Sequence, residues 1–295
     1  MDALIRKKPH KTKIKRTKNE KIIFTIVFIL LLLYSLTFIV SYFFVFMNTF
    51  KSADEYLDTG KFALPQSFHF ENYIKVFYSL EVNGTRYFGM VFNTLLFSLT
   101  GSIPALLSTA VSSYVCARYK FPGRRLIYLI NIITITISLP GSEVAYFKLW
   151  NDLGFTNSWK YILGCFGGFG SHFIILYGFW KSVDWAYAEA AYMDGATDMK
   201  ALFRVMLPQA FPIMGVFFIL GFITSWTSYK FSMLYMPNFP TIGHGLFEYQ
   251  YKTQRNMDVP MYFSALVITA IPSLILFGSF QDKIMTNMTI GGLKG

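Results

Sequence analysis

The sequence predicts an all-α membrane protein with six transmembrane helices. Hydrophobic residues make up 54% of the 295 residues, and charged residues only 15%, whereas soluble domains contain about 25% charged residues. Six stretches are apolar over about 20 residues, which is the length that a helix needs to cross the hydrocarbon core of a bilayer. These predicted spans cover residues 22–46, 88–117, 126–146, 161–179, 210–228 and 261–280.

Residues 1–21 form a basic tail in front of the first span, and residues 22–295 form one membrane domain. A net charge of +11 can indicate a nucleic-acid-binding protein. Here, however, the basic residues gather in the tail and beside the ends of spans, which is typical of a cytoplasmic anchor near anionic lipid. The first span is too long for the apolar region of a secretory signal peptide, and no small-residue cleavage site follows it.

The distribution of charge predicts the orientation in the membrane. The connection after the second span carries Arg118, Lys120, Arg124 and Arg125 without an acid, and such basic clusters lie on the cytoplasmic side. The first connection, residues 48–87, mixes acids and bases as an external segment does. Because the number of spans is even, we expect both termini in the cytoplasm of a bacterial cell, with a multi-pass chain in its plasma membrane.

Between the fourth and fifth spans lies a polar stretch, residues 184–208, that predicts a helix, a turn and a second helix. Asp184 can cap the first helix, which contains Glu189, Ala190 and Ala191. Gly195 can adopt the positive φ that ends a helix. Leu207-Pro208 closes the stretch, and we expect the proline to end the second helix.

This pattern resembles the EAA loop of bacterial ABC-importer permeases. The resemblance implies a type I importer permease fold with a cytoplasmic loop that docks on an ATP-hydrolysing subunit. We call residues 184–208 the coupling loop. In this interpretation Glu189 is the acidic anchor, Ala190 and Ala191 allow close docking, and Gly195 makes the turn. Asp194, Leu207 and Pro208 complete the candidate ATPase contacts. Asp184 departs from the family pattern, which often has proline there.

Three further segments resemble permeases of sugar importers, of the maltose type or lipo-oligosaccharide type. They are the external residues 64–73, the turn at residues 117–125 and the tail at residues 291–295. The resemblance implies a permease for a carbohydrate, in particular an oligosaccharide. It also implies three partners, namely a second homologous permease, two ATPase subunits and an extracellular solute-binding protein.

Catalytic chemistry is not predicted in this chain. The sequence has no phosphate-binding G-x-x-x-x-G-K-[ST] loop, so ATP and Mg²⁺ are expected on the partner ATPase, and no cofactor or metal on this chain. Cys116 and Cys165 are expected to be free thiols. Aromatic and amide side chains near the outer ends of spans give three candidates for a substrate path: Asn93, Trp226 and Tyr229.

Two alternatives remain open at this stage. An ion-coupled secondary carrier, or another kind of membrane protein, is disfavoured because the six spans lack acidic and basic residues in their interiors, whereas such carriers bind protons or sodium at ionisable groups. An ABC permease for a non-sugar solute has the same coupling loop, and only the sugar-type segments argue against it.

Overall fold

The structure is a computed structural model that describes residues 17–137, 141–252 and 258–290. Most of the basic tail and the sugar-type residues 291–295 lie outside the described residues. The described chain is almost entirely helical, with one two-stranded hairpin. The predicted all-α class is therefore confirmed.

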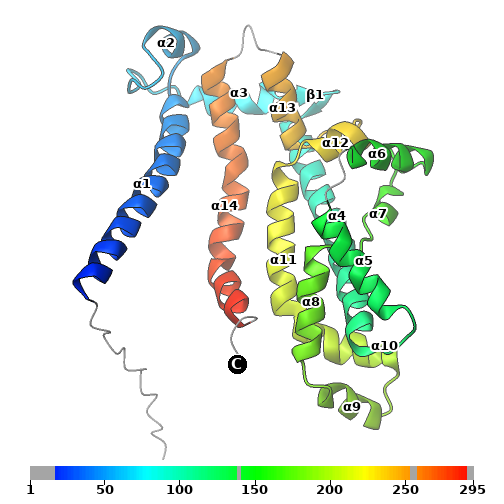
Figure 1. Cartoon of the computed structure of the whole chain (residues 1–295). Coiled ribbons are helices and arrows are strands. Elements are labelled where there is room, and N and C mark those ends of the chain that lie inside the picture. Colours follow the sequence, from blue (N-terminus) through cyan, green and yellow to red (C-terminus); the bar gives the residue numbers. More distant parts are fainter. Residues whose placement is uncertain (1–16, 138–140, 253–257, 291–295) are drawn as a thin grey trace, which may run out of the picture.

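Four helices in the described ranges are long and apolar enough to cross a membrane, which makes the chain a multi-pass membrane protein. They agree with the first, second, fifth and sixth predicted spans and lie roughly side by side (Figure 1). They are α1 (Lys18–Asn48), α4 (Tyr87–Arg118), α11 (Leu207–Thr227) and α14 (Val259–Ile290).

The third and fourth predicted spans are broken into shorter helices. The third consists of α5 (Arg124–Thr136) and α6 (Ser142–Asp152), with Gly141 at a φ of +79°. The fourth consists of α7 (Tyr161–Gly164) and α8 (Ser171–Ser182). The 13 residues of α5 and the 12 of α8 are about 20 and 18 Å long, which is shorter than the hydrocarbon core.

Glycines explain the break in the fourth span. Gly164, Gly167, Gly168 and Gly170 all lie in this span. Gly164 allows close packing, because a Cβ there would lie 2.6 Å from the ring of Trp150. Gly168 and Gly170, however, have φ angles of +159° and +126°, which are incompatible with a continuous helix. The expectation of an unbroken fourth span was wrong for this reason.

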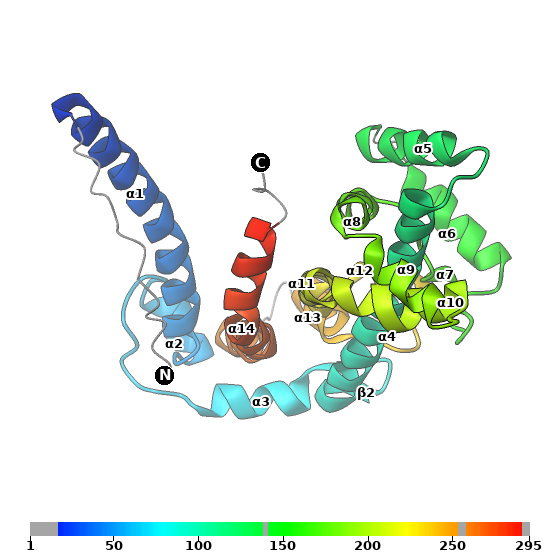
Figure 2. The same ribbon diagram turned by 90° about the horizontal axis from the view of Figure 1, so that it is seen from below.

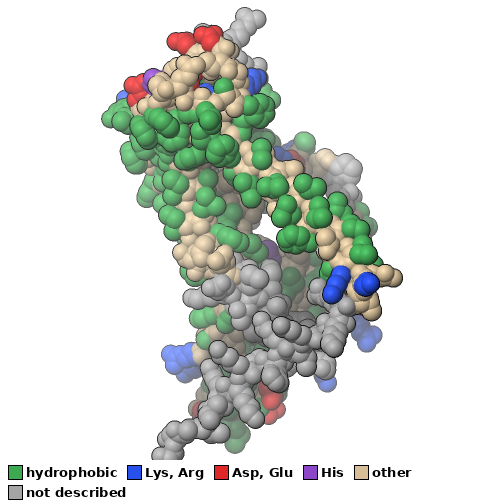
Figure 3. All heavy atoms as spheres, turned by 90° about the vertical axis from the view of Figure 1, so that its left-hand side faces the viewer, with side chains coloured by type: hydrophobic (Ala, Val, Ile, Leu, Met, Phe, Trp, Pro, Cys, Tyr) green, Lys and Arg blue, Asp and Glu red, His purple; other side chains and the backbone are tan. Residues whose placement is uncertain are grey.

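Helix α1 meets α14 near its C-terminal end, where Phe44 packs on Phe263, and leans away from it along the rest of its length (Figure 1). None of the residues in its most apolar window is buried. Figure 3 shows apolar side chains along this helix and acidic side chains at the upper end of the molecule in that view. Such a surface must contact lipid or another membrane-embedded chain.

The connection from residue 49 to residue 86 is structured. Figure 2 shows α3 running across the ends of the long helices, from α2 to the hairpin in front of α4. The Asn72 amide fixes it by donating to the carbonyls of Thr49 and Lys51, both at 2.8 Å. Beside it lie two short helices that follow α11. The elements on this side are α2 (Ala53–Asp58), α3 (Glu71–Ser79), β1 (Glu81–Val82), β2 (Thr85–Arg86), α12 (Lys230–Tyr235) and α13 (Ile242–Lys252).

The opposite end of the bundle carries the coupling loop, built from three short helical segments that lead into α11 (Figure 1). They are α9 (Ala186–Met193), α10 (Asp198–Lys200) and the π-helical turn η1 (Ala201–Met206). Cys116 is buried and Cys165 partly buried, and both are free thiols, as predicted.

Candidate functional site

The coupling loop has two arms, α9 before the Gly195 turn and α10 with the π-helical turn after it. The first arm is a helix that is capped at both ends. The Asp184 carboxylate accepts a hydrogen bond from the N–H of Ala186 at 3.0 Å, so Asp184 satisfies a free donor at the start of α9. At the other end Gly195 has a φ of +77°. Its N–H donates to the carbonyl of Tyr192, and the N–H of Ala196 donates to that of Ala191, both at 2.9 Å. These two bonds are the Schellman arrangement that ends helices at glycine, which confirms the predicted turn.

The second arm differs from its prediction, because Pro208 does not end the helix. Helical backbone continues from Asp198 through Pro208 to Thr227. The π-helical turn before the proline explains why, since the N–H of Leu207 donates to Leu202, five residues back. Pro208 has no N–H and cannot donate the usual helical hydrogen bond. The π-helical turn in front of it uses bonds to the carbonyl five residues back, so the backbone stays helical. The second arm is therefore rigidly continuous with α11.

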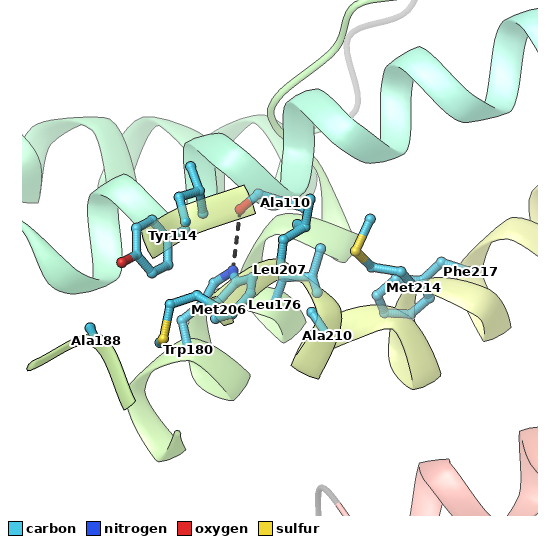
Figure 4. Close-up of a cluster of buried hydrophobic side chains, with 11 residues drawn as sticks. Ala110, Tyr114, Leu176, Trp180, Ala188, Met206, Leu207, Ala210, Met214 and Phe217 are labelled. Atoms are coloured by element: carbon cyan, nitrogen blue, oxygen red, sulfur yellow. Dashed lines mark hydrogen bonds between the residues drawn. The ribbon is translucent and has the colours of Figure 1, made fainter. Parts of the chain in front are cut away.

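One face of the loop packs on the bundle. Ala191 is nearly buried. Ala188 is fully buried, in a cluster with Tyr114, Trp180 and Met206. Figure 4 shows the side chains of this cluster converging from α4, α8, α9, the π-helical turn and α11. Small side chains let α9 lie close to its own bundle. The face of α9 that carries Ala188 and Ala191 therefore packs on the permease itself.

Trp180 lies at the centre of this cluster. Its ring is fully buried, and its indole N–H donates to the carbonyl of Ala110 at 3.2 Å (Figure 4) and to the hydroxyl of Ser113 at 3.1 Å. Tyr114 packs edge-on against it with ring centres 5.2 Å apart. The tryptophan therefore ties α8, which leads into the loop, to the last turns of α4.

The opposite face of the loop is uncovered and apolar. Met193 is 88% exposed, so within this structure its side chain makes little contact with the rest of the chain. The large apolar side chains exposed on both arms are Tyr187, Met193, Met199 and Phe203. Among the charged residues around them, Glu189 and Asp194 stand on the first arm and Lys200 and Arg204 on the second. Within the part of the chain that the structure describes, no cation lies within salt-bridge distance of Glu189.

The structure divides the predicted ATPase contacts between the two faces. Glu189, Ala190, Asp194 and Gly195 are on the exposed face. Ala191 and Leu207 are buried in the bundle, so these two residues cannot touch a partner in this conformation. Pro208 is exposed but belongs to the start of α11. The sequence analysis missed the exposed apolar residues, because the same loop also contains apolar residues that are buried, such as Leu202 and Met206.

The three candidates for a substrate path have structural roles. The Asn93 amide donates to the carbonyl of Pro240 at 3.0 Å. Trp226 is 2% exposed, and its indole N–H donates to the carbonyl of Thr269 at 2.9 Å, so its ring cannot stack on a sugar. Tyr229 stacks on Phe247 with ring centres 4.2 Å apart. Tyr229 lines a cavity of about 490 Å³ beside α13 and α14, but none of the three lines the cavity of about 720 Å³ among α4, α8 and α11.

A cavity of about 720 Å³ lies among α4, α6, α7, α8 and α11. Aromatic rings and small hydroxyl side chains alternate around it, and His172 packs on Phe217 with ring centres 4.3 Å apart. The aromatic and polar lining comprises Phe97, Ser102, Thr109, Tyr146, Trp150, Tyr161, Phe169, His172, Phe217, Phe218, Thr224, Ser225, Ser228, Phe231 and Thr241.

Comparison with known proteins identifies the family. Residues 102–288, which include the coupling loop, match the model of the binding-protein-dependent transport system inner membrane component. The diacetylchitobiose uptake system permease protein NgcG of Streptomyces coelicolor is 30% identical over 90% of this chain and 87% of its own length. The arabinooligosaccharides transport system permease protein AraQ of Bacillus subtilis is 27% identical over 93% of this chain and 96% of its length.

The fold has a solved counterpart. A chain of a bacterial ABC transporter involved in the import of the acidic polysaccharide alginate superposes with a TM-score of 0.75, at 20% identity, over 90% of this chain and 98% of that one. This chain belongs to the family of binding-protein-dependent transport system inner membrane components.

Proposed function

We propose that this chain is a membrane-spanning subunit of an ATP-driven ABC importer for oligosaccharides. The observation that carries the proposal is the two-faced coupling loop. One face is anchored in the bundle through Ala188 and Ala191, and the other presents Met193 and Glu189 to solvent. A helix fixed to a membrane bundle but apolar on its free side is a docking site for a partner.

The partner on this face is an ATP-hydrolysing subunit. Since the sequence lacks a phosphate-binding loop, the nucleotide and its Mg²⁺ are held by that partner, and this chain is a transport subunit rather than an enzyme. Met193 and Phe203 supply apolar contact, while Glu189 offers a carboxylate to a basic group. A charge-assisted hydrogen bond of this kind contributes about 1.5–3 kcal/mol when it is shielded from water.

A second permease of related structure completes the membrane unit. Helix α1 has no buried residue in its apolar window, and the 720 Å³ cavity is lined by this chain's helices on only part of its boundary. A second six-span chain would cover both surfaces. The external solute-binding protein implied by the family docks on the side of α2, α3 and α13, opposite the coupling loop. Both termini and the loop then lie in the cytoplasm.

The lining of the cavity supports a carbohydrate as substrate. Sugar rings present apolar C–H faces and many hydroxyl groups, and sites for them combine aromatic rings with hydrogen-bonding side chains. Trp150, Tyr161 and Phe231 supply rings, and Ser225 and His172 supply polar groups. Relatives named for diacetylchitobiose and arabinooligosaccharides point to short oligomers.

Uptake by the assembled complex tests this function. Proteoliposomes containing this chain, the second permease and the ATPase are expected to accumulate at least one oligosaccharide from a panel of chitin, arabinan, maltodextrin and uronate oligomers. Accumulation should require ATP inside and the binding protein outside, and a competing unlabelled sugar should abolish it. Uptake of only amino acids or ions, or accumulation without ATP, would contradict the proposal.

A further inference from the structure

Helix α4 connects the cavity to the coupling loop. Gly101, Ser102 and Thr109 in its middle line the cavity, and Arg118 is its last residue. Tyr119 follows directly and lies at the level of α9 and α10. Pro104 lies inside this helix, but no proline follows it before Arg118. A displacement of the last turn therefore reaches Ala105, Leu106 and Thr109, which line the cavity on the C-terminal side of the proline.

A hydrogen-bonded group joins the end of α4 to both arms of the loop. The carboxylate of Asp198 accepts from the hydroxyl of Tyr192 at 2.8 Å and from the hydroxyl of Tyr119 at 3.2 Å, and the two hydroxyls are 3.5 Å apart. Tyr192 belongs to α9, and Asp198 is the first residue of α10. We call Tyr119, Tyr192 and Asp198 the tyrosine–aspartate cluster.

The protonation state of Tyr119 suits this arrangement. Burial raises its pKa above the ordinary value, and the hydrogen bond with Tyr192 and the negative charge of Asp198 raise it further. The phenol therefore stays protonated at neutral pH and remains a donor to the carboxylate.

Arg118 holds the segment that enters the loop. Its guanidinium donates to the carbonyl of Val183 and lies over the ring of Trp185, 5.4 Å from the ring centre. Arg118 contacts the residues that lead into α9. Tyr119 contacts α9 itself and the start of the second arm. The bond from Tyr192 to Asp198 also joins the two arms to each other across the Gly195 turn.

We propose that Tyr119, Tyr192 and Asp198 are positioning residues that make the coupling loop and α4 move as one body, so that motion of the ATPase reaches the cavity. The inference rests on the proposed function, because it assumes that an ATPase drives the loop. It goes beyond that function because it names the contact that passes the motion of the ATPase from the loop to α4. The loop is also covalently continuous with α11.

Tyr119→Phe is the most specific test, because it keeps the ring that packs on Tyr114 and removes only the hydroxyl. In the complete complex we expect the ATPase to be retained and to hydrolyse ATP, while the sugar taken up per ATP falls roughly two- to thirtyfold. Asp198→Asn should act in the same direction. Tyr128→Phe is the matched control, since Tyr128 packs on Tyr177 of α8 and lies outside the cluster.

Chemical rescue separates transmission from folding. In a Cys116→Ser, Cys165→Ser background, Tyr119→Cys with Tyr192→Cys should lower uptake per ATP, and a short bis-maleimide that bridges the two thiols should restore it. An unchanged ratio in Tyr119→Phe, whatever the yield of complex, would overturn the inference, as would a bridge that fails to restore the ratio. Failure of the proposed function would look different, because the unsubstituted complex would then show no ATP-dependent sugar uptake.

Discussion

Complexes carrying Gly195→Val are expected to lose most of their ATP-dependent uptake, while membrane insertion is retained. Gly195 has a φ of +77°, and no atom lies within 4 Å of the position that a Cβ would occupy. The cost is therefore backbone strain, about 1–2 kcal/mol for an ordinary residue and more for a β-branched one. Relief of that strain redirects α9, so that Glu189 and Met193 no longer face the partner together.

Gly195→Asn is the matched control for this prediction, because asparagine tolerates the left-handed region better than other residues with a Cβ. Uptake and co-purification of the ATPase should stay near the unsubstituted level in Gly195→Asn and fall about tenfold in Gly195→Val, which corresponds to about 1.4 kcal/mol. Equal and full uptake in both variants would show that the direction of α9 is unimportant.

Trp180→Ala is expected to have the largest effect on stability. The substitution leaves a cavity beneath α9 and removes the donor to Ala110 and Ser113. Truncation of a buried tryptophan costs roughly 3–5 kcal/mol, mostly through lost packing. The protein level should fall, and the melting temperature in detergent should decrease by several degrees. Trp180→Phe should recover most of the stability, and a melting temperature unchanged in Trp180→Ala would contradict this account of the cluster.

Local chemistry made the coupling loop predictable. Asp184 and Gly195 act through bonds to residues one to four positions away, so the sequence contains what determines them. The helix that continues through Pro208 was not predictable in the same way. It depends on a π-helical turn whose hydrogen-bond register is stabilised by packing of Leu202, Met206 and Leu207 in the core, and such packing is not visible in a local pattern.

The orientation of side chains around each helix also depends on the assembled fold. Ala190 and Ala191 are neighbours in sequence, but only Ala191 is buried, because it lies on the same face of α9 as Ala188, which packs in the cluster around Trp180. Trp226 resembles a sugar-stacking residue in sequence, yet α14 supplies the carbonyl of Thr269 that takes its N–H. The contact between Tyr119 and Asp198 joins residues 79 positions apart, and nothing in either segment alone indicates it.

Site-directed cross-linking at position 193 tests the central claim most directly. In the assembled complex, a photoreactive maleimide on Met193→Cys, with Cys116→Ser and Cys165→Ser in the same chain, should form an adduct with the ATPase subunit. Met193 is 88% exposed on the free face of the loop. The same probe directed to Ala188→Cys, on the buried face, should form none. Absence of an ATPase adduct at position 193, or an adduct with the external binding protein, would contradict both the docking role of this loop and its cytoplasmic location.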